Sequence, residues 1–166
     1  MGGVRKEYFS LIMKEIFKLE FAMFKYNEDT QLYWFNGQTY EPNLNFELVG
    51  NLMGIAFYNN MFVDMPVVPA CYKILLNQEP DLNDMAQWQP ETAKSLKYIL
   101  DYKASENNGA RLEDVVCRNF LVDEVSFGAV KEVELIPGGR QIPVTEDNRQ
   151  EFVRLFIEYE FKIQCA

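Results

Sequence analysis

The sequence contains no histidine and only three cysteines among its 166 residues. The lack of histidine excludes histidine-based catalytic triads, histidine general bases and histidine metal ligands. The cysteines, Cys71, Cys117 and Cys165, are widely spaced and form no C-x-x-C pair. Such a sparse, odd-numbered set indicates reduced thiols of the cytoplasm, or also of the nucleus, rather than a disulfide framework.

Basic residues are also scarce, with 16 lysines and arginines against 25 acidic residues and a net charge of −9. Phosphate binding requires clustered lysine and arginine, so this balance disfavours nucleic acid as the main partner and favours a basic protein. No glycine-rich phosphate loop is present, because the "PGGR" string lacks the following Lys-Ser/Thr. We therefore expect no cofactor and no metal ion.

No hydrophobic run is long enough to cross a membrane. The most apolar segment, Leu48 to Val63, includes three asparagines, whereas a span needs about 20 apolar residues. Gly50 and Gly54 give this segment a G-x-x-x-G spacing, which permits close packing but is a weak signal outside lipid. No signal peptide is visible at the start. We expect a buried helix and no membrane partner.

Residue periodicity predicts mainly helices in the first half of the chain. An amphipathic helix is expected over 4–26 and a short aromatic strand over 31–36, closed by a turn at Asn36-Gly37. A second helix is expected over 45–60, and a third after Pro69.

The composition changes near Pro80. Asp and Asn start signals and Pro90 predict helices that end near Gly109. "RNFLVDE", "AVKEVELI" and "RQIPVT" predict three short strands, with a tight turn at 137–139. Thr145 is expected to cap a final amphipathic helix. The pattern indicates a mainly helical α+β fold, with a larger helical part over 1–79 and a smaller helix-plus-β-hairpin part over 80–166.

The candidates for chemistry are carboxylate pairs and thiols. The pairs Asp81 with Asp84 and Glu113 with Asp114 could serve acid–base work, but surface solvation is favoured, because no apolar segment surrounds them. For Cys71, at the start of an apolar helix, a buried small side chain is favoured over a reactive thiolate. The same alternatives stay open for Cys117, which precedes Arg118.

Two apolar stripes stand out in the second part, Leu96 with Ile99 and Phe152 with Phe156. Each stripe alone is typical of a core. A small subdomain cannot hide every such side chain, however, so part of this surface is expected to remain as a docking groove for a protein. From the residues alone, the chain is an acidic protein-binding module without visible catalytic machinery.

Several strings, in order, resemble one family. They are "GGVRKEYFSLIMKEIF", "MFKYNEDTQLYWFN", "FELVGNLMGIAFYNNMFVDMP", "YKILLN", "SLKYILDY" and "FGAVKEVELIPGGRQIPVTEDNRQEFVRLFIEY". Together they resemble the amino-terminal lobe of HECT-type ubiquitin-protein ligases over nearly the whole chain. The resemblance implies a bilobal fold whose smaller part, residues 80–166, binds a ubiquitin-conjugating enzyme.

In that family a shallow apolar groove receives an apolar or aromatic anchor from a loop of the conjugating enzyme. The residues of this sequence at matching positions are Leu96, Ile99, Tyr102, Phe152 and Phe156. Thr92 stands where a relative has leucine, which would trim one wall of the groove. Residues 105–118 match poorly, so the resemblance does not decide whether they contribute to the groove.

The resemblance also implies a mechanism. Ubiquitin passes from the conjugating enzyme to a ligase cysteine and then to a substrate lysine, and that cysteine lies in a carboxy-terminal lobe that is absent from this sequence. We therefore expect no catalytic residue here, no activity of this fragment alone, and substrate recognition through regions outside it. The alternative is a non-catalytic interaction or self-association module. A stand-alone enzyme is disfavoured by the missing histidine.

Overall fold

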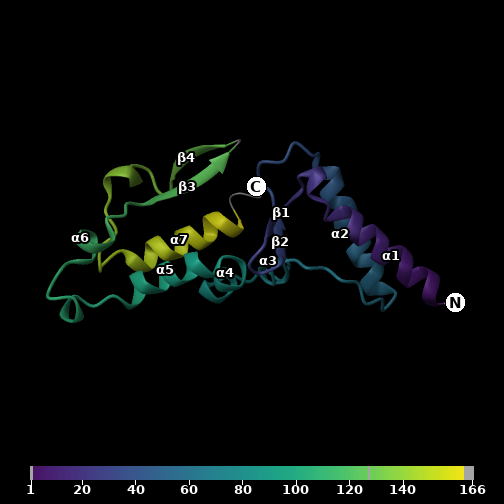
Figure 1. Ribbon diagram of the computed structural model, residues 1–166, viewed down its shortest axis with the longest axis horizontal. Coiled ribbons are helices and arrows are strands. Elements are labelled where there is room, and N and C mark those ends of the chain that lie inside the picture. The colour runs from purple at the N-terminus through teal and green to yellow at the C-terminus, as the bar shows by residue number, and fades with distance from the viewer. Residues whose placement is uncertain (1, 127, 163–166) are drawn as a thin grey trace. The chain divides into compact units, whose positions relative to one another are not determined.

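A computed structural model describes residues 2–126 and 128–162 of the chain (Figure 1). Helices predominate, together with two small antiparallel hairpins, which confirms the mainly helical α+β fold. The chain forms two compact units, residues 1–68 and 69–166. In the sequence, the boundary between the units lies at Pro69, before the change of composition near Pro80.

The first unit contains two helices and a hairpin. In order they are α1 (Gly2–Ile16), the 3₁₀ turn η1 (Leu19–Phe21), β1 (Phe24–Asn27), β2 (Leu32–Phe35) and α2 (Asn43–Tyr58). The helix predicted over 4–26 is too long: α1 ends at Ile16, and the chain turns at Ala22, whose φ is 50°. Beyond this turn the chain extends as β1, because aromatic side chains pair well across a hairpin. Phe24 faces Phe35 across this pair.

Aromatic rings form the core of the first unit. The Phe17 and Phe24 ring centroids are 4.8 Å apart, and those of Phe24 and Phe35 are 5.4 Å apart. Trp34 is buried beside them. The strand predicted over 31–36 is thus confirmed as β2, and its rings supply the apolar area that holds the hairpin in place.

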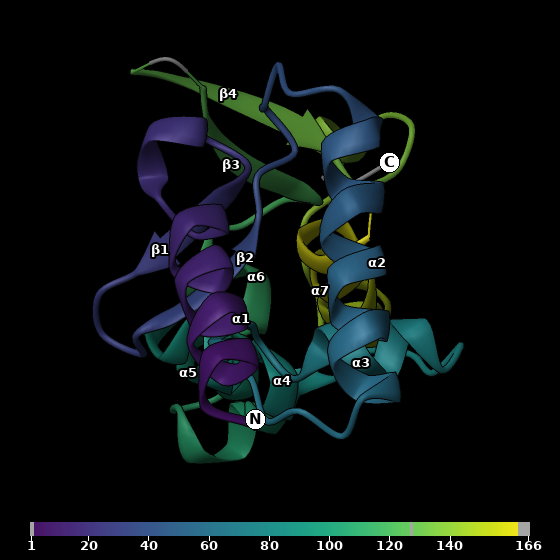
Figure 2. The same cartoon turned by 90° about the vertical axis from the view of Figure 1, so that its right-hand side faces the viewer.

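The second helix of this unit is less buried than its sequence predicts. Only Val49 and Ala56 of α2 are buried, and a Cβ built on Gly50 or Gly54 would meet no atom within 4 Å. Within the residues that the structure describes, the two glycines therefore do not serve the close packing expected of them. Figure 2 shows α2 as a continuous helix in the first unit.

The second unit consists of helices and one antiparallel hairpin. Asp81 starts α4, since its carboxylate accepts from the backbone N–H groups of Asn83 and Asp84, and Pro90 occupies the first turn of α5. The elements are α3 (Ala70–Leu75), α4 (Leu82–Trp88), α5 (Pro90–Asp101), η2 (Ala104–Glu106), α6 (Leu112–Val116), β3 (Leu121–Ser126), β4 (Ala129–Glu134), η3 (Gly139–Gln141) and α7 (Arg149–Phe161).

The carboxylate pair at the start of α4 has a structural role. Asp84 is 1% exposed, so the expected surface solvation is wrong for this residue. Its carboxylate accepts from the Asp81 backbone N–H at 2.7 Å and from the Lys73 ammonium group at 2.6 Å. A buried carboxylate needs such partners, and the Lys73 contact ties α3 to α4.

The end of the hairpin differs from its prediction in two places. The third predicted strand is absent from the described residues, because Gly139–Gln141 forms η3 and only an isolated bridge joins Asn119 to Pro143. The final helix begins at Arg149 rather than at Thr145. The Asn148 side chain instead accepts from the Thr145 backbone N–H at 2.7 Å. These turns lead the chain from the end of β4 to the start of α7.

Candidate functional site

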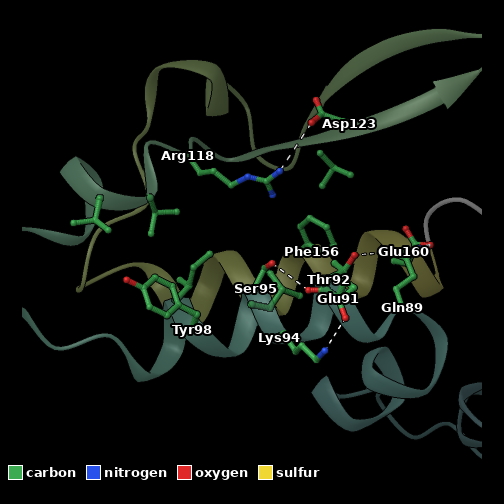
Figure 3. Close-up of a pocket in the computed structure, with 15 residues that line it drawn as sticks. Gln89, Glu91, Thr92, Lys94, Ser95, Tyr98, Arg118, Asp123, Phe156 and Glu160 are labelled. Atoms are coloured by element: carbon green, nitrogen blue, oxygen red, sulfur yellow. Dashed lines mark hydrogen bonds and ion pairs between the residues drawn. The ribbon is translucent and has the colours of Figure 1, made fainter. Parts of the chain in front are cut away.

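A groove of about 800 Å³ runs along one face of the second unit. Helix α5 forms one side of it, α6 and β3 form the other, and α7 contributes Phe156 and Glu160 (Figure 3). Figure 3 shows Arg118 and Asp123 across the groove from the labelled side chains of α5. The groove is open to solvent at its rim and apolar at its base.

Three of the five residues predicted to bind a conjugating enzyme line the groove: Leu96, Ile99 and Phe156. Leu96 and Ile99 are three residues apart on α5 and so lie on one face of that helix. Phe156 comes from α7, more than 50 residues later in the chain. The fold thus brings the two apolar stripes of the sequence together.

The other two predicted residues support the groove from behind and do not line it. The Tyr102 hydroxyl donates to the Ala110 carbonyl at 2.9 Å, and the Tyr102 carbonyl accepts from Arg149 at 2.7 Å. Burial raises the pKa of Tyr102. The Phe152 ring lies edge-on to Phe120, with centroids 5.4 Å apart. Both residues belong to the core under the groove.

All five residues are nearly inaccessible to solvent, so the expectation that they remain partly exposed is wrong. Phe156 is 7% exposed, the largest fraction, and Phe152 is fully buried. Helices α5 and α7 pack against each other, and the Phe120 ring lies edge-on against Phe152. Whether they bind a conjugating enzyme stays a prediction, and the solvent-accessible surface of the groove is made by other residues.

The accessible apolar residues at the rim are Tyr98 and Val115, which are 49% and 43% exposed. The prediction named neither residue. Val115 and its neighbour Val116 belong to α6, inside the segment 105–118 that carried little resemblance. The string "LEDVV" is too short to reveal a helix by its periodicity, whereas Tyr98 lies one helical turn after Ser95 and its spacing was readable.

One end of the groove is polar and includes a buried carboxylate. Glu160 is 8% exposed, and its Oε1 accepts from Trp88 Nε1 at 3.0 Å and from Gln89 Nε2 at 2.9 Å. The Gln89 side-chain carbonyl in turn accepts from the Thr92 hydroxyl at 2.9 Å. Such hydrogen bonds offset the free-energy cost of burying a carboxylate. Figure 3 shows Gln89, Thr92 and Glu160 gathered at this end.

The charges of the rim are paired locally. Lys94 lies 2.6 Å from Glu91, and Arg118 lies 4.0 Å from Asp123. Exposed pairs of this kind contribute little to stability.

The groove contains no evident catalytic group. Cys71 is buried, and burial raises the pKa of its thiol, which disfavours the reactive thiolate. Cys117 is exposed and its thiol donates to the Asp114 carbonyl, while Cys165 lies outside the described residues. Over residues 2–126 and 128–162, no cluster of three or more potential ligands for a metal ion occurs, and no helix is long and apolar enough to span a membrane.

Comparison with known proteins decides what kind of domain carries this groove. A family model described as HECT-domain (ubiquitin-transferase) matches residues 10–166. The chain belongs to the HECT-domain family. The resemblance read from the sequence motifs is thereby confirmed.

Individual members of the HECT family match nearly the whole chain. It is 39% identical over 165 residues to the probable E3 ubiquitin-protein ligase HERC4 of Homo sapiens, covering 99% of this chain and 15% of HERC4. It is 39% identical over 162 residues to human HERC3, covering 98% of this chain and 15% of HERC3. It is 35% identical over 173 residues to HECTD2 of Mus musculus, covering 96% of this chain and 22% of HECTD2. The chain therefore corresponds to a small share of these ligases.

Proposed function

We propose that this chain is the part of a HECT ubiquitin-protein ligase that docks a ubiquitin-charged conjugating enzyme, and that the groove between α5, α6, β3 and α7 is the docking surface. The observation that carries this proposal is an apolar-based groove in the second unit of a chain that belongs to the HECT family. The relatives are probable E3 ubiquitin-protein ligases, and the reaction proposed for the parent protein is theirs.

The groove suits a small, transient protein interface. Its buried base of Leu96, Ile99 and Phe156 is held by the core and is therefore already in place before a partner arrives. Tyr98 and Val115 then offer accessible apolar area at the rim. A few well-placed apolar contacts can carry most of the affinity of such an interface. The net charge of −9 would favour encounter with a basic surface.

The reaction is two successive transfers of the ubiquitin acyl group. The thiolate of a ligase cysteine attacks the thioester carbonyl of the charged conjugating enzyme, and the thiol of that enzyme leaves. A substrate lysine amine then attacks the new thioester, forms an isopeptide bond and releases the ligase thiol. The first step exchanges one thioester for another, so the groove contributes positioning rather than bond energy.

The accepting cysteine is proposed to lie outside this chain. Cys71 is buried with a raised thiol pKa, and Cys117 sits outside the groove lining. We propose that the 166 residues alone form no ubiquitin thioester. Incubation with activating enzyme, charged conjugating enzymes and ubiquitin should yield no reductant-sensitive adduct on the chain, and such an adduct would contradict this assignment.

Calorimetric titration of a panel of conjugating enzymes tests the docking proposal. Val115→Asp, at the rim, should weaken binding at least roughly tenfold. Val130→Asp on β4, where valine is 67% exposed and outside the groove, is its matched control and should leave binding unchanged. Tyr98→Ala and Tyr72→Ala form a second pair, since both tyrosines are about half exposed. No binding by any conjugating enzyme, or equal effects of the paired variants, would overturn the proposal.

Self-association is the second candidate, and one observation favours it. Four of the exposed apolar residues of α2 follow one face of the helix, at spacings of four, seven and three residues: Leu44, Leu48, Ile55 and Tyr58. Phe57, which is 87% exposed, lies off this face. Sedimentation velocity of the chain over a concentration series tests this function. A dimer that Leu48→Lys dissociates would support it, and a monomer at all concentrations would eliminate it.

A further inference from the structure

Strand β4 is paired along one edge only. Among the residues that the structure describes, its one sheet partner is β3, which lies between β4 and α7 (Figure 1). The β3 side of the hairpin borders the groove, since Val122 and Asp123 line it. The outer edge of β4 therefore lies on the side of the hairpin away from α7 and from the groove.

The register of the hairpin decides which backbone groups lie at this outer edge. The Leu135 N–H donates to the Phe120 carbonyl at 2.9 Å, and the register of the two strands makes these residues direct partners. Hydrogen-bonded and non-hydrogen-bonded pairs alternate along an antiparallel pair. Counting back from Leu135, the backbone groups that point outward belong to alternate residues of β4: Val130, Glu132 and Glu134.

These three residues are accessible. Each of them is exposed, and in the described part of the chain no backbone hydrogen bond outside the helices and strand pairs uses their N–H or C=O groups. A row of such groups is a template for pairing with a further strand. From Val130 to Glu134 the edge is five residues long, or about 17 Å, which is the usual length of a strand.

The outward residues also place their side chains on one face of the hairpin, and this face is acidic. Glu132 pairs with Arg140 at 2.9 Å, but both are about half exposed and such a pair contributes little. The Glu134 carboxylate accepts from two backbone N–H groups of the following turn, which position it and leave it further acceptor capacity. Asp123 of β3 faces Glu132 and lies 4.0 Å from Arg118. The face thus carries three carboxylates against two guanidinium groups.

At the tip of the hairpin the same face is apolar. Val130 faces Val125 across the two strands, and these valines are 67% and 66% exposed. An apolar residue of a third strand, placed opposite Val130, would extend this pair into a row of three. Such a row removes apolar surface from water.

The carboxylates disfavour a second copy of the chain as the occupant of this edge. An antiparallel pairing of two β4 strands that covers the whole edge is centred on Glu132, so the Glu132 carboxylates of the two copies would face each other. Like charges directly opposite each other destabilise a strand pair, whereas opposite charges stabilise it. The edge is therefore complementary to a strand with basic side chains.

We propose that the outer edge of β4 binds an extended segment of another protein as a third strand of the hairpin. Lysine or arginine of the segment would lie opposite Glu134 and Glu132, and an apolar residue opposite Val130. In an antiparallel strand these are alternate positions, so the segment has the pattern basic-x-basic-x-apolar. The edge is a second binding surface, separate from the groove and independent of the docking function proposed for it.

Hydrogen exchange and NMR titration of the 166-residue chain test the geometry of this edge. The probe is the capped peptide Thr-Lys-Thr-Lys-Thr-Val-Thr. In the free chain, the amides of Val130, Glu132 and Glu134 should exchange at least roughly tenfold faster than those of Lys131 and Val133, which point toward β3. Saturating peptide should slow the three outward amides. Slow exchange of all five amides in the free chain, or no spectral change at millimolar peptide, would overturn the proposal.

Two methylated peptides separate strand addition from charge attraction. N-methylation of the second lysine removes an N–H group that points toward β4, so it should weaken binding at least roughly tenfold. N-methylation of the threonine that follows alters an N–H group that points away from β4, so it should weaken binding less than about threefold. Equal losses for the two peptides would overturn strand addition.

Charge variants of the chain locate the preference for basic residues. Glu132→Lys should weaken binding of the lysine peptide roughly tenfold and favour a peptide with glutamate in place of both lysines. Glu106→Lys, at an exposed position of η2, makes the same change of net charge outside the hairpin and should leave the preference unchanged. Equal effects of the two variants would show that only net charge matters and would overturn the site.

The other possible occupants give different results. A dimer of the chain in which the Glu132 amide is protected without peptide would assign the edge to a second copy. Protection of that amide in the intact parent ligase would assign it to a segment of the ligase itself, and either result would overturn the proposal. Val115→Asp at the groove should leave peptide binding unchanged. Displacement of the peptide by a conjugating enzyme would contradict two separate surfaces, whereas failure of the groove to bind any such enzyme would leave the peptide result unaffected.

Discussion

Trp88 and Glu160 are 72 residues apart in the sequence, yet the Trp88 indole donates a 3.0 Å hydrogen bond to the Glu160 carboxylate. Both side chains are buried, at 4% and 8% exposure. The bond joins the end of α4 to the last turn of α7. It therefore closes the second unit and holds the polar end of the groove.

Removing this acceptor should destabilise the second unit. Glu160→Ala leaves the buried Trp88 and Gln89 donors without their carboxylate, which should lower the free energy of unfolding by about 2–3 kcal/mol. Urea denaturation followed by tryptophan fluorescence measures it. Glu158→Ala, on the same helix, removes only an exposed pair with Arg154 and should cost about 0.5 kcal/mol or less. Similar losses for the two variants would contradict the role of Glu160.

The cap of α4 should make stability depend on acid pH. Burial opposes ionisation of Asp81, but hydrogen bonds from Lys73 and from the backbone of Asp84 and Asn83 outweigh it and lower the pKa of Asp81 below 3.8. A lowered pKa in the folded state gives stability that is present above the unfolded value and is lost as pH falls through the folded value.

Asp81→Asn isolates this effect, because asparagine also caps helices well. The variant should be less stable than wild type at pH 7, by no more than about 1 kcal/mol because Asp81 is largely exposed. The difference should shrink below pH 3.8, which urea titrations at several pH values can follow. A constant difference from pH 7 to pH 2 would show that ionisation of Asp81 contributes nothing.

Two glycines should respond oppositely to alanine. A Cβ on Gly139 would lie 2.6 Å from the Phe120 carbonyl oxygen, a backbone atom that cannot move away alone. Gly139→Ala should therefore destabilise the chain by about 1–3 kcal/mol. Gly50 lies in helix α2 with open space around it, so Gly50→Ala should stabilise by about 0.5–1 kcal/mol. Thermal unfolding compares the two, and a stable Gly139→Ala variant would refute the close approach.

The two described thiols should differ in reactivity. Cys117 is exposed, whereas Cys71 is buried and burial raises its thiol pKa. Iodoacetamide at pH 8 should modify the peptide that contains Cys117 first, and that of Cys71 only after urea is added. Mass spectrometry after brief labelling distinguishes the peptides. Rapid labelling of Cys71 in the folded chain would contradict its burial.

Local signals in the sequence were sufficient to predict many of the helices and strands of the second unit. Asp81 and Pro90 mark the starts of α4 and α5 because their chemistry at a helix start does not depend on distant residues. Strands β3 and β4 follow from two short runs that each contain two valines, a residue type enriched in strands. The family resemblance rests on the same kind of local string, and it is confirmed over residues 10–166.

The remaining features depend on packing between distant segments. The stripes of α5 and α7 were readable, but their burial depends on how the two helices pack against each other and on Phe120, whose ring lies against Phe152. Helix α6 is five residues long, too short for periodicity to reveal. Glu160 did leave a signal, because it lies four and eight residues after Phe156 and Phe152 and so falls on their buried face. An acidic residue at such a position indicates a buried hydrogen-bond acceptor.

The burial of Leu96, Ile99 and Phe156 sets how this domain can diversify. Any mutation that reshapes the base of the groove also removes core contacts, so selection for folding opposes it before partner choice is affected. The rim residues do not combine these two roles, because none of them is buried: Thr92, Ser95, Tyr98 and Val115. Changes of partner among paralogues should therefore accumulate at these rim positions, and an engineer who wants a new pairing should randomise the rim and leave the base untouched.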